Sequence, residues 1–395
     1  MTDEREMQHV GSTRRDVLAA VAGSGAVAGC TSTLPPLGQR VRFGRVDVPS
    51  PGPPGYRPWI PAASALPGGT PAAVQSVDPA ALPAGGIGRG LFATRLDWLG
   101  TPFESFELAV NVGSAIVLEG PTDPATVAGA VGATTYTSAG EYEGYDLYTR
   151  LDVPRTIAAG DGAAVVAYGE TRRETVQALV DARDGRVGRR HETDDAFATL
   201  SGEAGLADFT VFDSLGIVER SVSEALLSST ALEYTDEASY FQYQYLFPRP
   251  ADVPRRAIRR ELRASETALD ADAVDVRSAG RRAVVDLRTD PPTGSRAAPV
   301  VTWGVDYDAR ASSVTLRHEA GTPIDAAELI VRVGTVEEVD GLPDDLDDPQ
   351  FSDEYDVVEP GDSLRLPAGG DDELVRIEYR HADRRTSVLL SYNLP

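Results

Sequence analysis

The chain carries a large excess of acid over base, and this balance constrains its folding more than any other feature of the sequence. Its 61 Asp and Glu residues against 37 basic residues give a formal net charge of −24, and every basic residue is Arg. In dilute buffer such self-repulsion opposes a compact state, whereas in molar salt the Debye length falls to about 3 Å. The composition therefore predicts a halophilic protein whose fold depends on salt. An acidic mesophilic protein is the alternative.

The same charge argues against nucleic acid as a partner. Phosphate binding needs a basic face, and most of the arginines here are scattered among acids. The densest basic run spans residues 255–263 and contains Arg255, Arg256, Arg259, Arg260 and Arg263. We expect a helix there, with the arginine stems packed on apolar surface and their charged ends near carboxylates.

Residues 1–29 have the organisation of an export signal. Arg14 and Arg15 precede a weakly apolar run, which ends in Val27, Ala28 and Gly29 directly before Cys30. That run is shorter than the roughly 20 apolar residues needed to cross a bilayer, and it contains several glycines. The pattern predicts a twin-arginine signal peptide that is removed before Cys30.

Arg14-Arg15 and the lipobox Val27 to Cys30 together resemble those of twin-arginine-exported haloarchaeal lipoproteins. The resemblance implies export in a folded state and a lipid on Cys30, which would hold the protein on the outer face of the cell membrane. Cys30 is also the single cysteine, so no intramolecular disulfide is expected. A buried structural cysteine in a cytosolic protein is the alternative.

Residues 30–90 are rich in proline, glycine and alanine, most densely in the segments 49–54 and 67–69. This composition predicts an extended tether between the anchor and the folded body, onto which Tyr56, Trp59 and Ile60 would dock. A fully solvated stalk is the alternative.

Residues 91–296 read as alternating strands and helices. A β-rich run over 106–118 is followed by a short helix to about 131, and Asp161-Gly162 marks a hairpin turn. A similar order recurs, with a strand at 239–247, a helix at 253–265 and a hairpin over 273–288. We therefore predict an α+β fold with duplicated ferredoxin-like β-α-β-β halves.

Residues 297–395 contain short alternating or β-branched runs divided by turn residues, which predicts a small all-β sandwich domain. Within it, Val314 to Asp325 and Leu329 to Gly334 resemble the β-domain of haloarchaeal pilin-like exported proteins. The amino-terminal hydrophobic helix of pilins is missing, so the resemblance does not imply polymerisation.

Catalytic motifs are scarce. The chain has four histidines, and no Gly-x-Ser-x-Gly elbow, His-Glu-x-x-His helix or phosphate-binding loop is found. The best cluster for a metal is His191-Glu192-Thr193-Asp194-Asp195, but a helix cap by Thr193 or Asp194 is the simpler account. His318, with Glu319 beside it, and His381 are expected at a strand end and in a turn. No cofactor or metal is predicted.

Two further features are candidates for binding. The acidic stretch within residues 344–356 has enough carboxylates for Ca²⁺, but it lacks the spacing of a calcium loop, and a solvated loop is favoured. Tyr243, Tyr245 and Phe247 share one face of a strand with Phe241 beside them, a pattern that fits either an exposed glycan or protein site or a half-buried core.

These observations predict a non-enzymatic lipoprotein of the cell surface, either a binding protein or a structural component of the envelope. Its partners would be the membrane, through lipid on Cys30, and proteins or glycans of the envelope. The alternatives are a solute-binding lipoprotein of a transporter and, with less support, a metal-dependent hydrolase centred on His191.

Overall fold

The computed structural model describes residues 40–394, except 72, 84–88, 90–91, 93–95, 214–216, 293–296, 336–338, 340–348, 369–372 and 382–385. The predicted export signal at Arg14 and Arg15, the lipobox 27–29 and Cys30 lie outside the described residues. Within the described part, no helix has the length and apolar character needed to span a bilayer.

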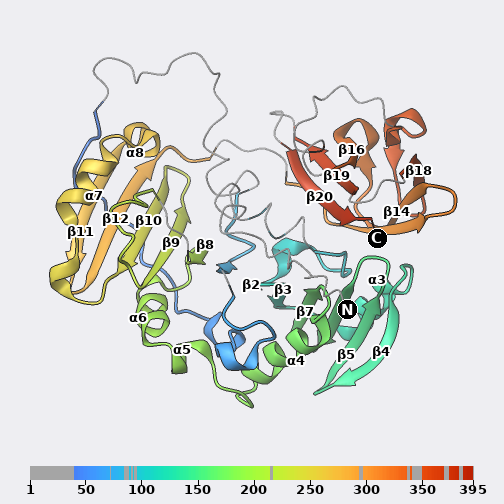
Figure 1. Ribbon diagram of the computed structural model, residues 1–395, viewed down its shortest axis with the longest axis horizontal. Helices are drawn as coiled ribbons and strands as arrows, with labels where there is room; N and C mark the ends of the chain where they lie inside the picture. The colour runs from blue at the N-terminus through green and yellow to red at the C-terminus, as the bar shows by residue number, and fades with distance from the viewer. Residues whose placement is uncertain are drawn as a thin grey trace, which may run out of the picture.

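Most of the described chain belongs to one antiparallel sheet of twelve strands, which curves across the molecule (Figure 1). The spatial order is β11-β12-β10-β9-β8-β1-β2-β3-β7-β6-β5-β4. The bounds are β1 Val74–Val77, β2 Leu108–Val112, β3 Ala115–Glu119, β4 Thr137–Tyr142, β5 Tyr145–Arg150, β6 Arg155–Gly160, β7 Ala163–Tyr168, β8 Phe209–Phe212, β9 Leu227–Tyr234, β10 Ser239–Leu246, β11 Ala273–Ala279 and β12 Arg282–Thr289.

Short helices connect these strands and cover them. They are α3 Pro124–Val131, α4 Arg172–Arg183, α5 Arg190–Thr193, α6 Asp195–Ala204, α7 Arg255–Leu262 and α8 Glu266–Asp270. Single 3-10 turns occur at η2 Arg57–Trp59, η3 Ala63–Ala65, η4 Phe103–Ser105, η5 Pro250–Asp252, η6 Ala326–Glu328 and η7 Phe351–Asp353. The Asp123 carboxylate caps α3 by accepting from the backbone N–H groups of Ala125 and Thr126 at 3.1 and 3.2 Å.

Both faces of the sheet are buried along its central strands, where residues that point to either side are inaccessible, whereas the edge strand β4 is largely exposed. One face packs against α4 and α6 and against the segment that contains Tyr56, Trp59 and Ile60. The other face packs against α3 near β5 and β6 and against α7 and α8 near β11 and β12. We call this unit, the described residues from 40 to 292, the sheet body.

The described residues from 297 onward form a second unit, the C-terminal body, with a core of its own. Two three-stranded sheets, β13-β14-β18 and β16-β19-β20, and the pair β15-β17 surround Trp303 and Phe351. The bounds are β13 Val301–Asp308, β14 Ser313–Gly321, β15 Ile324–Asp325, β16 Leu329–Gly334, β17 Val357–Val358, β18 Ser363–Pro367, β19 Leu374–Arg380 and β20 Thr386–Asn393. Figure 1 shows this body, in orange and red, beside the β4–β5 end of the large sheet.

The prediction of duplicated ferredoxin-like β-α-β-β halves is wrong, because the protein is mainly antiparallel β and its halves share one continuous sheet. The run 106–118 is a hairpin, since Gly113 adopts a φ of 64° and turns β2 back into β3. The Ser- and Thr-containing strand β9 was not predicted either, although it pairs with β10 along its whole length. Each half therefore has three strands before its helix, β1 to β3 before α3 and β8 to β10 before α7, where the prediction had one.

The tether prediction for residues 30–90 also differs from the structure over the part that is described. Val74–Val77 form β1, which pairs with β2 on one side and β8 on the other, and so lies inside the sheet. The expected docking of Tyr56, Trp59 and Ile60 is confirmed, because all three are fully buried. The proline- and glycine-rich stretches 49–54 and 67–69 are exposed or half-buried, and they lie between residues that pack on the sheet.

Candidate functional site

The sheet body and the C-terminal body meet at the loop that joins β5 to β6. Val153, in this loop, packs into the core of the C-terminal body. The backbone N–H of Trp98 donates to Thr302 Oγ1 at 2.7 Å, and that of Val305 donates to Asp152 Oδ2 at 3.4 Å. The junction therefore combines apolar packing with hydrogen bonds between loops of the sheet body and strand β13.

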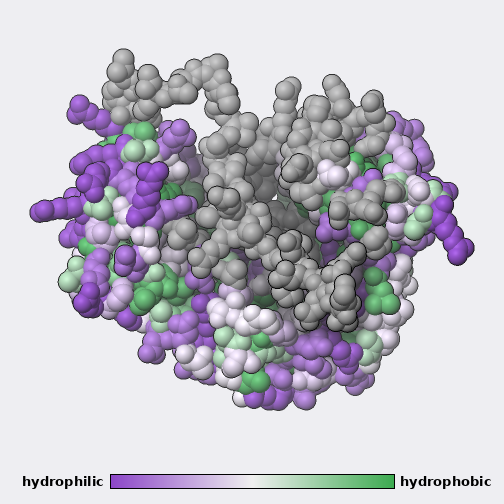
Figure 2. Space-filling model, viewed as in Figure 1, coloured by the Kyte–Doolittle hydropathy of each residue, from purple (hydrophilic) through white to green (hydrophobic). Residues whose placement is uncertain are grey.

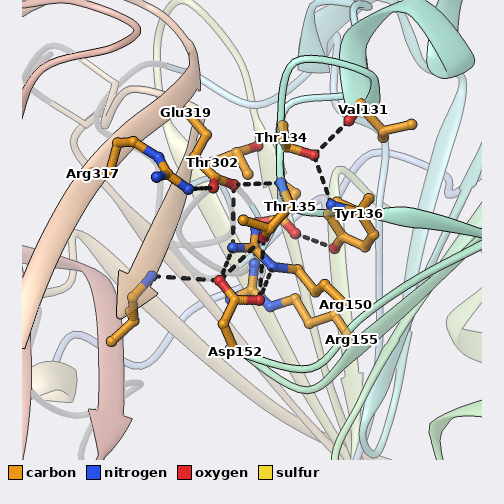
Figure 3. A network of polar contacts seen from close by, with 12 residues as sticks. Val131, Thr134, Thr135, Tyr136, Arg150, Asp152, Arg155, Thr302, Arg317 and Glu319 are labelled. Carbon is orange, nitrogen blue, oxygen red and sulfur yellow. Dashed lines mark hydrogen bonds and ion pairs between the residues drawn. The ribbon is translucent and has the colours of Figure 1, made fainter. Parts of the chain in front are cut away.

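A buried arginine lies at the centre of this junction (Figure 3). Arg150 ends β5, its side chain is 0% exposed, and its Nε donates to Asp152 Oδ1 at 2.9 Å. Its Nη2 lies 3.2 Å from Oε2 of Glu319, which belongs to β14 of the other body. The Glu319 side chain is 1% exposed and also pairs with Arg317 at 2.5 Å. Two acids, one from each body, thus hold one desolvated cation.

Further polar groups complete the network on the side of the sheet body. Arg155 forms an ion pair with the buried carboxylate of Asp97, which also accepts a hydrogen bond from the Tyr136 hydroxyl. The guanidinium carbon of Arg150 lies 5.1 Å from the centroid of the Tyr136 ring. The charges balance, since the network contains the cations Arg150, Arg155 and Arg317 and the anions Asp97, Asp152 and Glu319.

This environment fixes the charge of its members. Burial alone would lower the pKa of Arg150, but the hydrogen bonds to Asp152 and the charges of Asp97 and Glu319 outweigh it and raise the pKa. Burial opposes ionisation of Asp152 too, yet the contacts with Arg150 hold its pKa below the ordinary value. Burial and the Asp97 charge raise the pKa of Tyr136 well above its ordinary value. These groups therefore keep their protonation state across the physiological range.

A pocket of about 460 Å³ lies beside the network, between the two bodies. Gly304 in its wall allows the close approach of Glu319, since a Cβ at that position would lie 2.6 Å from Glu319 Oε1. The polar residues of the lining are Thr135, Thr137, Thr149, Thr315, Arg150, Arg317, Asp152 and Asp306.

The lining is suited to hold a polar ligand by hydrogen bonds. Threonine hydroxyls both donate and accept, and the charged groups are held in place by their partners. Nη1 of Arg150 is buried and has no hydrogen-bond partner among the described residues, so its capacity to donate is unused. The described lining contains neither an imidazole nor a thiol, and its carboxylates are those of Asp306 and of Asp152, which is held ionised.

The structure separates the residues that the sequence had grouped around His191. Asp194 caps α6 by accepting from the backbone N–H of Phe197 at 2.9 Å, so the capping interpretation is confirmed. Glu192 accepts from the backbone N–H of Arg189 at 3.0 Å. Among the described residues, no group of three or more His, Cys, Asp or Glu side chains has the geometry of a metal site.

The other candidates are dispersed as well. His318 is fully buried beside Trp303, at a ring-centroid distance of 5.4 Å, which differs from the expected strand end. His381 contacts Ser387 Oγ at 2.8 Å. Much of the acidic stretch 344–356 lies outside the described residues, and the described Asp353 accepts from the backbone N–H of Gln350 at 2.7 Å.

The aromatic stripe belongs to the core. Tyr243, Tyr245 and Phe247 are 5%, 0% and 0% exposed and pack under α7 and α8. The core interpretation is therefore confirmed, and an exposed aromatic binding face is not present on this strand.

The junction was not predicted from the sequence. The weak signals were two arginine-x-acid triplets, Arg150-Leu151-Asp152 at the end of β5 and Arg317-His318-Glu319 within β14. Each triplet places both charges on one side of an extended chain. No pattern within either triplet indicates that residues 150 and 319 meet across the junction.

Comparisons with known proteins give no family. No family model matches the sequence, and no curated protein matches it. Solved structures of TP0453 in crystal forms IV, I and III are similar over 58% of this chain and 92–94% of that chain, at 9% identity and TM-scores of 0.35–0.36. A likeness at this level defines neither the fold family nor the function.

Proposed function

We propose that this protein is a non-enzymatic lipoprotein of the cell surface of a halophile, and that it binds a small polar ligand in the pocket between its two bodies. The pocket is the observation that carries the binding part of this proposal. Its walls come from both bodies, and its lining combines hydroxyl groups with fixed charges and one unpaired buried donor on Arg150. Hydroxyl and carboxylate oxygens are the ligand groups that such a lining would recognise.

The location rests on Arg14-Arg15 and on Val27 to Cys30. Replacing Cys30 by Ser removes the sulfur that would carry the lipid, so we expect the variant to be released into the medium. The measurement is the fraction of protein in washed membranes. Retention of the variant at the level of the wild type would refute the anchor.

The pocket is tested by filling it. Leu151 lies in the lining and is 77% exposed, so Leu151→Trp adds bulk to the pocket without disturbing a core. Leu226→Trp makes the same change at a position that is 53% exposed and outside the lining. We expect a ligand from a panel of monosaccharides and small carboxylic acids to raise the melting temperature of the wild type and of Leu226→Trp, and not of Leu151→Trp. An equal response of both variants would overturn the assignment of the pocket.

A solute-binding lipoprotein of a transporter is the second candidate. The position of the pocket between two bodies favours it, because solute receptors close around ligands at such junctions. The buried ion network opposes it, because opening would separate Arg150 from Glu319. X-ray scattering with and without the ligand distinguishes the two proposals, since only a transporter receptor requires closure. The hydrolase alternative centred on His191 gains no support, because Asp194 serves as a helix cap.

A further inference from the structure

One part of this acidic protein presents a basic surface. The segment 255–263, which contains α7, has five exposed arginines: Arg255, Arg256, Arg259, Arg260 and Arg263. None of them forms an ion pair with another residue in the described ranges. The expectation that their charged ends meet carboxylates is therefore not fulfilled there. Figure 2 shows hydrophilic side chains projecting from this part of the molecule, at the left.

The beginning of the described chain extends the same surface. Phe43 forms a parallel bridge with Val274 of β11, and Gly44 N–H donates to the Val274 carbonyl at 3.0 Å. The guanidinium carbons of Arg259 and Arg263 lie 5.6 and 5.7 Å from the centroid of the Phe43 ring. Residues 40–45 are thereby held beside α7. We call Arg40, Arg42 and the five arginines of 255–263 the basic surface.

Nearby acids do not neutralise the basic surface. Glu261 is the acid within 255–263, and its carboxylate accepts from the backbone N–H groups of Arg220 and Ser221 at 3.1 and 2.8 Å. Asp47 pairs with Arg45, and Asp252 pairs with Arg249. Arg255 and Arg259 each donate to the Val276 carbonyl at 3.4 Å, which leaves their charges without a paired acid among the described residues. The basic surface is therefore exposed on a chain whose net charge is −24.

We infer that the basic surface binds the anionic headgroups of the membrane that carries the protein. The inference rests on the proposed lipid anchor, because Cys30 precedes Arg40 by ten residues, a span of at most about 35 Å. The anchor would hold the basic surface within reach of the bilayer and so raise its effective concentration. Guanidinium groups bind phosphate in bidentate fashion at contact distance, which does not depend on long-range attraction in molar salt.

Vesicle binding tests this inference apart from the anchor. Full-length protein with Cys30→Ser is mixed with vesicles of phosphatidylglycerol or phosphatidylcholine, at a salt concentration at which circular dichroism shows it folded. We expect binding to phosphatidylglycerol, and a loss of about threefold to thirtyfold in partition on Arg256→Gln with Arg260→Gln. A thirtyfold loss corresponds to about 1 kcal/mol per arginine at physiological ionic strength, and a threefold loss corresponds to stronger screening by salt.

Arg173→Gln with Arg310→Gln is the matched control, since both positions are exposed and the net charge changes equally. All variants keep residues 1–29, so any lipid binding by that segment is common to them. Equal losses in the two pairs, or equal binding to both lipids, would overturn the inference. Membrane retention of the wild type reports on the anchor separately, so failure of either proposal is recognised without the other.

Discussion

At the residue scale, the junction joins two bodies through charges that have lost their water. Breaking a buried ion pair by removing one partner leaves an uncompensated charge, which costs about 3 to 5 kcal/mol. Arg150 keeps Asp152 when Glu319 is replaced, so the lower end of that range applies. The network therefore fixes the geometry of the pocket wall more than it adds net stability.

Glu319→Gln should lower the free energy of unfolding by about 3 kcal/mol, because the Arg150 guanidinium stays buried with one anion fewer. Denaturant unfolding in molar salt measures this. Glu107→Gln is the control, since Glu107 is exposed and its replacement should cost less than about 0.5 kcal/mol. A Glu319→Gln variant as stable as the control would contradict the description of the network.

The environment of Glu233, away from the junction, predicts that the free energy of unfolding depends on pH. Burial, the charge of Asp208 and a hydrogen bond to it raise the pKa of Glu233 from 4.5 to about 8. The native state therefore holds a proton that the unfolded state has lost, and this pair should lower the free energy of unfolding as the pH rises from about 4.5 to 8.

We expect the free energy of unfolding to decrease less with rising pH in Glu233→Gln than in the wild type. Denaturant unfolding at several pH values in constant salt measures this. The exposed Glu237→Gln should keep the slope of the wild type. An unchanged slope in Glu233→Gln would show that the carboxyl pair does not share a proton.

At the element scale, local signals in the sequence predicted local structure well. The short helix predicted to end at about residue 131 is α3, and the Asp161-Gly162 hairpin is β6–β7. Such elements follow from caps and turns between near neighbours in the chain. The position of β1 between β2 and β8 and the contact of Arg150 with Glu319 depend on residues far apart, which periodicity does not encode.

The hairpin β2–β3 was not predicted from the sequence, and substitutions of glycine test the account of its turn. Gly113→Ala should lower the free energy of unfolding by about 1 kcal/mol, because Gly113 has a φ of 64° that disfavours a Cβ. Gly129→Ala should instead raise it by about 0.5 to 1 kcal/mol, because Gly129 lies in α3 with open space around its Cα. Equal effects of the two substitutions on denaturant unfolding would contradict this account of the turn.

At the scale of the whole molecule, the acidic charge should make folding depend on salt. We expect the circular dichroism signal of strands to be lost as NaCl is lowered from molar concentration, because repulsion within a chain of net charge −24 is no longer screened. Replacing NaCl by KCl at equal ionic strength should preserve the circular dichroism signal. A signal that persists at very low salt would contradict the halophilic interpretation.

The proposed location of the protein requires a lipid on one sulfur, that of Cys30. Mass spectrometry of the amino terminus of protein purified from native membranes tests this most directly. The account predicts a chain that begins at Cys30 and carries a diacylglycerol-type lipid in thioether linkage to Sγ. An unmodified thiol at Cys30, or a chain that retains residues 1–29, would contradict it.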